Sequence, residues 1–303
     1  MPWFLIALLN PILHAGVNHL DKYLISKYFR NIQVGSFVIF SGLFSVILLP
    51  IVIFLSHAPF SITISNGLIL AVNGTLVVIG VMSYLYALNE DETSFVVPLF
   101  QITPIFGLIL SFLFLGEVVQ FSNIMGAIVV LFGSAVLSLD IKGEKFKFKK
   151  KVVFFMLIAC LCYAINIVIF KSIALDNGFW ESLIWDLVGK IIFAIFLFTF
   201  INSFRSAFLT VLQTYKLKFV LLTGLDEMLT IFGDWALVFS ALMAPVFFVQ
   251  LVSATQPIFV FIFGVILTFL YPQIGREILE RKLLFQKLFG ITMVIIGAII
   301  LSF

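Results

Sequence analysis

The sequence predicts an all-α polytopic membrane protein with ten transmembrane helices, arranged as two inverted five-helix repeats. Its composition, its apolar runs and an internal sequence repeat predict this fold. Of 303 residues, 62% are hydrophobic and 11% are charged, whereas soluble domains carry about 25% charged residues. A soluble chain could not bury so much apolar surface, so we expect membrane spans.

The apolar runs have the length that a membrane helix requires, which is about 20 residues. Their apolar residues are continuous rather than alternating, which excludes barrel strands. The ten runs are 3–22, 34–56, 67–88, 93–115, 121–139, 152–172, 181–201, 217–240, 245–271 and 287–303.

The internal repeat divides the chain into residues 1–140, a basic linker at 141–151, and residues 152–303. Ala87 precedes the Pro-Ile-Phe that begins at Pro104, and Ala241 precedes the same tripeptide at Pro257. Because five helices is an odd number, the second copy must be inverted in the membrane. Inverted repeats are typical of secondary transporters, whose substrate site lies between the repeats.

A second repeated feature is a pair of glycines seven residues apart. Gly126 and Gly133 in the fifth run match Gly290 and Gly297 in the tenth. That spacing places each pair on one helix face, which indicates close helix packing or a dimer contact.

The basic residues predict the orientation of the chain. Sixteen of the 18 Lys and Arg residues fall in or beside the odd-numbered loops, including six lysines in Asp140–Lys151; Lys171 and Lys190 are the exceptions. The positive-inside rule places such loops in the cytoplasm, so both termini would be extracytoplasmic. The net charge of +3 is too small to suggest nucleic acid.

Ionisable side chains inside the apolar runs are the first functional candidates, because their insertion is costly. Asp186 and Lys190 are four residues apart and can pair on one helix face. Asp226, Thr230 and Asp234 form a stripe on the eighth run. Two interpretations stay open: a charge pair that only joins helices, or an excess of acids that takes up a proton or binds a cationic substrate group.

The first run carries a polar stripe that contains His14 and Asn18, and we expect it to face a cavity or a neighbouring helix. Histidine can carry a proton near neutral pH, although a hydrogen-bonded packing role is the alternative. Asn166 has a comparable depth in the second repeat. Trp235 is a candidate for the cavity wall.

Polar residues and prolines recur in the fourth and ninth runs, as Gln101 with Pro104 and Gln256 with Pro257. Proline inside a membrane helix removes a backbone donor and bends the helix. We therefore predict two bent helices that act as gates, with a static kink as the alternative.

The repeated blocks resemble the EamA-like, ten-helix branch of the drug/metabolite transporter superfamily. The matching residues are Tyr86-Ala87-Leu88, Pro104, Gly116-Glu117, Gly126, Gly133, Ala241-Leu242, Pro257, Gly290 and Gly297. The resemblance implies two repeats, a central cavity and alternating access, with both termini in the cytoplasm. That orientation is opposite to the one that the charge count predicts.

These observations together predict a secondary transporter of the cytoplasmic membrane. Its substrate would be a small metabolite such as an amino acid, its direction export, and proton coupling is an open option. A lipid flippase of the same fold is the main alternative, and a membrane-embedded transferase is a weaker one. The sequence offers no metal-ligand spacing or cofactor motif, so we expect no cofactor and no enzyme activity. The expected partners are the substrate and the bilayer, with the protein a monomer or a homodimer.

Overall fold

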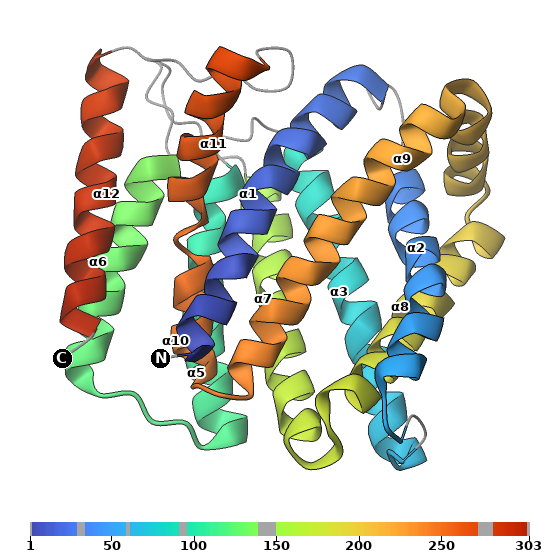
Figure 1. Cartoon of the computed structure of the whole chain (residues 1–303), viewed down its shortest axis with the longest axis horizontal. Helices are drawn as coiled ribbons and strands as arrows, with labels where there is room; N and C mark the ends of the chain where they lie inside the picture. Colours follow the sequence, from blue (N-terminus) through green and yellow to red (C-terminus); the bar gives the residue numbers. More distant parts are fainter. Residues whose placement is uncertain are drawn as a thin grey trace.

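The structure, a computed structural model, describes residues 2–28, 34–58, 61–90, 96–138, 150–271 and 281–301. Over these residues the chain is all-α (Figure 1). The helices are α1 (Pro2–Tyr28), α2 (Val34–Leu55), α3 (Ile64–Glu90), η1 (Val97–Ile102), α5 (Thr103–Leu115), α6 (Phe121–Ser138), α7 (Lys150–Asn177), α8 (Phe179–Phe200), α9 (Asn202–Ala241), α10 (Val246–Ser253), α11 (Gln256–Leu270) and α12 (Arg281–Leu301). Most of the linker predicted at 141–151 lies outside the described residues.

Seven stretches of the described chain are long and apolar enough to cross a membrane. They are Pro2–Asp21, Gly35–Leu55, Ile64–Ala87, Lys150–Asn177, Phe179–Phe200, Val246–Leu270 and Leu283–Ile300. Two further apolar stretches are shorter, at Leu99–Leu115 and Phe121–Leu137. The remaining predicted run lies in α9, which carries three acids between Asp226 and Asp234. The chain is therefore a multi-pass helical membrane protein.

The N-terminal part of α9 differs from the prediction. Residues 202–216 were expected in a loop, but the helix is continuous over 40 residues from Asn202 to Ala241. This segment mixes polar and apolar residues and so lacks the hydropathy of a span. It contains neither proline nor glycine, the residues that most often end a helix.

The two repeated prolines occupy equivalent positions in the two halves of the chain. Pro104 is the second residue of α5, directly after η1, and Pro257 is the second residue of α11, after a break at Ala254 and Thr255. Proline is well tolerated in the first turn of a helix, where its missing N–H would have no helical partner. Each proline therefore lies where the backbone changes, from a 3₁₀ segment to an α-helix at Pro104 and from a two-residue turn to an α-helix at Pro257. The proposed bending and gating at these positions stays a prediction.

The helices before and after residues 139–149, which we call the first and second halves, pack mainly against each other. α1 packs along α9, and α3 packs along α7. α2 packs on α8, and α6 packs on α12. Figure 1 shows α1 beside α9 near the centre, and α6 with α12 at one edge.

The contact between α6 and α12 depends on the predicted glycines. A methyl group on Gly133 would lie 2.8 Å from the carbonyl oxygen of Gly290. A methyl group on Gly297 would lie 2.7 Å from the carbonyl oxygen of Gly126. The two glycine faces thus allow close approach of these helices within one chain.

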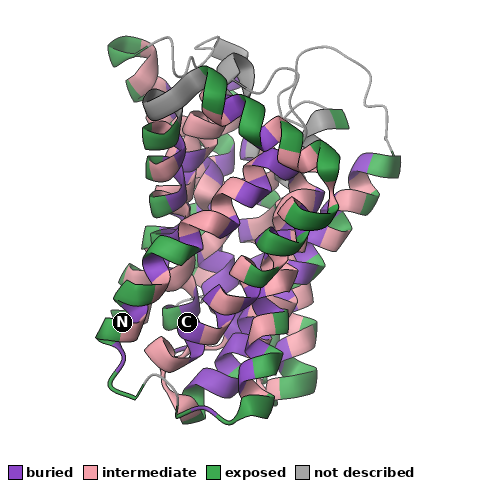
Figure 2. Ribbon diagram, turned by 90° about the vertical axis from the view of Figure 1, so that its right-hand side faces the viewer, coloured by how far each residue is buried: buried purple, intermediate pink, exposed green. Residues whose placement is uncertain are grey.

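The outer surface of the bundle is largely apolar. Large side chains such as Phe54, Phe114 and Phe285 are at least 73% exposed. Figure 2 shows exposed residues on the outside of the helices and buried residues between them. A surface of this kind fits lipid rather than water.

The helices alternate in direction, which gives the molecule two distinct ends (Figure 1). We call them the Lys150 end, where α1 and α3 finish and α7 begins, and the Glu117 end, where α5 and α7 finish. The N- and C-termini lie toward the Glu117 end (Figures 1 and 2).

Candidate functional site

A cavity of about 220 Å³ lies between the two halves of the chain. Its walls come from α1, α2, α3, η1 and α5 in the first half and from α7, α9, α10 and α11 in the second. The structure brings together at this cavity ten residues that the sequence singled out: His14, Asn18, Gln101, Pro104, Asn166, Asp226, Thr230, Asp234, Gln256 and Pro257.

The polar stripe of α1 faces this cavity and α9. Asn10 Nδ2 donates to the carbonyl oxygen of Gly233 at 3.1 Å, and Asn10 Oδ1 accepts a hydrogen bond from the Ser253 hydroxyl. One turn further along α1, His14 Nε2 lies 3.0 Å from Asp234 Oδ1. These contacts join α1 to α9 and α10 and set the depth of the His14–Asp234 pair in the cavity.

The His14–Asp234 pair keeps contact with the cavity space. The His14 side chain is 23% exposed and the Asp234 side chain is 37% exposed, and both line the cavity. A charge or hydrogen-bonding group at this position is therefore accessible to a solute or water inside the protein.

Three more carboxyl groups line the cavity: Asp21 on α1 and Asp226 and Glu227 on α9. The Ser41 hydroxyl donates to Glu227 Oε2 at 2.8 Å. Glu227 follows Asp226 directly in the chain, and Asp21 lines the same cavity from α1. Asp21 belongs to the polar stripe of α1 that was expected to face a cavity, and Glu227 adjoins Asp226, although neither was among the site residues selected from the sequence.

Four buried oxygen atoms at the cavity have no hydrogen-bond partner among the described residues, and two of them are Oγ1 of Thr103 and Oε1 of Gln250. The other two are Oδ1 of Asp226 and Oε1 of Gln101, whose residues are 1% and 8% exposed. Buried polar atoms are normally satisfied, so an unpaired one indicates a missing water, ion or ligand. The Asp226 and Gln101 oxygens therefore mark places where a bound molecule would find an acceptor.

Aromatic rings from the two halves form part of the cavity wall. The rings of Tyr84 and Phe100 have centroids 5.0 Å apart, and those of Phe100 and Tyr163 are 6.1 Å apart. All three residues line the cavity. Phe37 on α2 adds a fourth ring.

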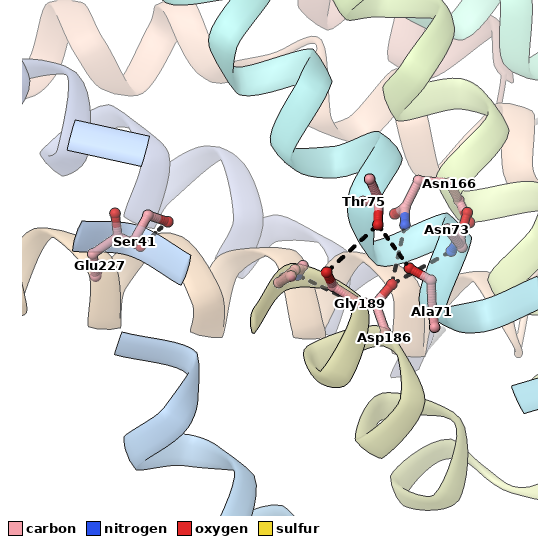
Figure 3. A network of polar contacts seen from close by, with 9 residues as sticks. Ser41, Ala71, Asn73, Thr75, Asn166, Asp186, Gly189 and Glu227 are labelled. Carbon is pink, nitrogen blue, oxygen red and sulfur yellow. Dashed lines mark hydrogen bonds and ion pairs between the residues drawn. The ribbon is translucent and has the colours of Figure 1, made fainter. Parts of the chain in front are cut away.

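Asp186 and Lys190 lie outside the main cavity and line a smaller one. Asp186 belongs to a polar network between α3, α7 and α8 (Figure 3). Lys190 Nζ lies 3.0 Å from Asp186 Oδ2. Asn73 Nδ2 and Asn166 Nδ2 both donate to Asp186 Oδ1 at 3.5 Å. Asp186 thus neutralises the charge of Lys190 outside the main cavity.

A second cavity, of about 20 Å³, lies between this polar network and the main cavity. Asn166 and Asp234 border both cavities. Trp235 lines only the smaller cavity, and its ring lies 6.1 Å from that of Trp180. Among the predicted residues, Asp186, Lys190 and Trp235 thus lie beside the main cavity and do not line it.

The cavity occupies the part of the bundle nearer the Lys150 end. Its lining residues run from Asn10 to Asp21 on α1, from Val77 to Leu85 on α3, and from Asp226 to Val238 on α9. On α1 and α3 the segments that lead to the Glu117 end, residues 2–9 and 64–76, contribute no lining residue, whereas on α9 the lining residues continue to Val238.

The Glu117 end is held together by an ion pair that the sequence analysis missed. Lys171 Nζ on α7 lies 2.6 Å from Glu117 Oε1 and donates to the carbonyl oxygen of Ala244 at 2.8 Å. The backbone N–H of Val246 donates to Glu117 Oε2 at 2.8 Å. Gly116, at φ 66°, ends α5 in the left-handed region and turns the chain so that Glu117 follows. We call this group of four residues (Glu117, Lys171, Ala244 and Val246) the Glu117 latch.

No group of three or more His, Cys, Asp or Glu residues with metal-binding geometry occurs in the described part of the chain. Cys160 and Cys162 are buried on α7, and the Cys160 thiol donates to the carbonyl oxygen of Leu99 at 3.4 Å. The cavity therefore offers carboxylates, one imidazole, amides and aromatic rings as its binding groups.

Comparisons with known proteins place this arrangement in a family. Residues 1–139 match the EamA-like transporter family. An uncharacterized protein from Methanocaldococcus jannaschii is 35% identical over 95 residues, which cover 31% of this chain and 69% of that protein. A solved structure, described only as the crystal structure of a protein, matches 99% of this chain and 98% of its own with a TM-score of 0.69 at 12% identity. Through residues 1–139 the chain belongs to the EamA-like transporter family.

Proposed function

We propose that this protein is a secondary transporter that moves a small solute across the cytoplasmic membrane by alternating access. Membership of the EamA-like family implies secondary transport of small solutes. The finer claim is that residues 1–140 and 152–303 form two inverted five-helix repeats that rock about the central cavity. The family resemblance favours export as the direction.

The packing of the helices supports two inverted repeats. If α1 corresponds to α7 and α3 to α9, an inverted repeat requires each contact to have a symmetric counterpart. The contact of α1 with α9 then matches that of α7 with α3, and both occur. The contacts of α2 with α8 and of α6 with α12 join corresponding helices, as elements on a two-fold axis would.

A single observation carries the proposal: the cavity is built from ionisable side chains of both halves at membrane depth. His14 and Asp21 come from the first half, and Asp226, Glu227 and Asp234 come from the second. A purely structural bundle has no need for so many acids there, because each is costly to insert. A solute bound here contacts both halves, so their relative motion can carry it.

The two ends of the molecule indicate how access would alternate. The cavity lies toward the Lys150 end, whereas the Glu117 latch joins α5, α7 and the start of α10 at the other end. We propose that this conformation is closed at the latch, and that transport requires the Lys171–Glu117 pair to separate.

The His14–Asp234 pair is the proposed coupling site. It joins the halves through α1 and α9 and faces the cavity. Protonation would change the charge of this pair and hence its attraction for a bound solute. This step gives a transmembrane proton gradient a route to drive transport.

Flux into proteoliposomes tests the proposal. The purified protein should produce saturable counterflow of at least one solute from a panel of labelled amino acids, amines and small metabolites. His14→Gln with Asp226→Asn should abolish that flux, whereas Asp176→Asn, on the exposed end of α7, should retain it. Flux equal to that of empty vesicles for the whole panel, or translocation of labelled lipid in its place, would overturn the proposal.

A further inference from the structure

Acidic side chains outnumber basic ones in the cavity wall. Among the described residues, four carboxyl groups line it, from Asp21, Asp226, Glu227 and Asp234, and His14 is the single basic lining residue. Lys190 on α8, which borders the smaller cavity, is already paired with Asp186. The wall is therefore poor in positive charge and rich in acceptors for it.

The hydrogen bonds of these acids leave binding capacity unused. Asp234 Oδ1 is within hydrogen-bond distance of His14 Nε2, and Glu227 Oε2 accepts a hydrogen bond from the Ser41 hydroxyl. Asp226 is 1% exposed, yet its Oδ1 has no partner within the described part of the chain, and Oε1 of Gln101 is in the same state. A bound donor with a positive charge would satisfy both the charge and the unpaired oxygens.

The aromatic rings are suited to the same kind of group. Tyr84, Phe100 and Tyr163 line the cavity, and their rings adjoin one another at centroid distances of 5.0 and 6.1 Å. The faces of aromatic rings attract cations, and this attraction increases when the cation is removed from water. Rings and carboxylates around one enclosed space are a common way to bind an ammonium group.

We propose that the solute bound in this cavity is a small organic cation with an ammonium group. The ammonium group would lie between the carboxyl groups of Asp226 and Asp21 and the rings of Tyr84 and Tyr163. The His14–Asp234 pair would lie beside it, deeper in the bundle. This inference rests on the proposed function and names the chemical class of its substrate.

The cavity size sets an upper limit to that cation. About 220 Å³ holds a molecule of modest size, and pockets for drug-sized ligands range from about 300 to 1,000 Å³. Small amines and quaternary ammonium ions fit this limit better than large lipophilic cations.

Binding to the purified full-length protein in detergent tests the inference by calorimetry. The probes are choline, butylammonium and 1,4-diaminobutane. The control ligand is 3,3-dimethylbutan-1-ol, which has the shape of choline without its charge. We expect at least one cation to bind and the neutral control to bind more weakly by about tenfold or more. Asp226→Asn and Asp21→Asn should each weaken cation binding by a similar factor, and Asp176→Asn should not.

The outcomes separate this inference from the proposed function. Equal binding of choline and its neutral analogue, or full cation affinity in both Asp226→Asn and Asp21→Asn, would overturn the cationic class. Failure of all three cations to bind would overturn it as well. In each of these cases, counterflow of a neutral or anionic solute would still support the proposed transporter function. The proposed function itself fails only if no solute of the panel shows flux. Using two single variants keeps the test valid if one of them does not fold.

Discussion

His14 and Asp234 are 220 residues apart in the chain, yet His14 Nε2 lies 3.0 Å from Asp234 Oδ1 across α1 and α9. One partner belongs to each half of the molecule, and both face the cavity. A rocking motion of the halves would move these two side chains relative to each other. Such a motion would therefore change the contact between His14 and Asp234, and with it the charged groups that the cavity presents to a solute.

Asp234→Asn is the first test of that relation. The change removes the charge but keeps a side chain of the same shape beside His14. We expect flux in proteoliposomes to fall about tenfold or more, and its dependence on an imposed pH gradient to disappear. Asp176→Asn is the matched control, because it removes the same charge from an exposed position. Unchanged flux with unchanged pH dependence would remove Asp234 from the mechanism.

Asp186→Asn should act on stability. It leaves the Lys190 ammonium without its ion-pair partner in a site where the lysine side chain is 14% exposed. Breaking a buried ion pair costs about 3–5 kcal/mol, chiefly because the remaining charge stays buried. We expect a lower thermal unfolding temperature in detergent, and recovery of most of the loss when Lys190→Met is added. A double variant no more stable than Asp186→Asn alone would show that the two side chains do not depend on each other.

Gly133→Ala and Gly16→Ala form a matched pair of substitutions. A methyl group at Gly133 would meet the carbonyl oxygen of Gly290 at 2.8 Å, whereas the nearest atom at Gly16 would be a Phe263 carbon at 4.0 Å. Overpacking costs about 1–3 kcal/mol, while alanine in place of a helical glycine is intrinsically favourable. Thermal unfolding should show Gly133→Ala destabilised and Gly16→Ala equal to or above the wild type. Equal effects of the two changes would contradict the close packing of α6 on α12.

The charge count predicts an orientation in the membrane that can be measured directly. With Cys160 and Cys162 replaced by alanine, single cysteines are placed at Gly143, which lies outside the described residues, and at Ser61, between α2 and α3. The positive-inside rule predicts that Ser61→Cys reacts with a membrane-impermeant thiol reagent in intact cells and that Gly143→Cys does not. The reverse pattern would establish the orientation that the family resemblance implies.

Much of the fold could be predicted because the membrane imposes it. A span needs about 20 apolar residues, and this requirement is visible in single-sequence hydropathy. Helix ends were less predictable: Asn202 begins α9 fifteen residues before the predicted span, because helix formation continues beyond the apolar segment. The prolines alone did not show the backbone that precedes them, which is a 3₁₀ segment before Pro104 and a two-residue turn before Pro257.

The site was predictable where residues share one helix. The stripe of α1 and the stripe of α9 were visible at helical spacing, and both face the cavity. Contacts between helices were not predictable. Lys171 and Glu117 each lie at the end of an apolar run and resemble ordinary interfacial residues, and their pairing depends on how α5 and α7 finish together. Likewise, spacing could not show that Asp186 and Lys190 face the smaller cavity.

Alternating access predicts that one residue in the cavity can be reached from both faces of the membrane. The most direct measurement is the labelling of Asn18→Cys, without Cys160 and Cys162, by a membrane-impermeant thiol reagent in right-side-out and inverted vesicles. Labelling should occur from each face, and Glu117→Gln, which weakens the Glu117 latch, should accelerate labelling from the Glu117 end. Labelling from the Lys150 end alone, in both the parent and the Glu117→Gln protein, would contradict alternating access about this cavity.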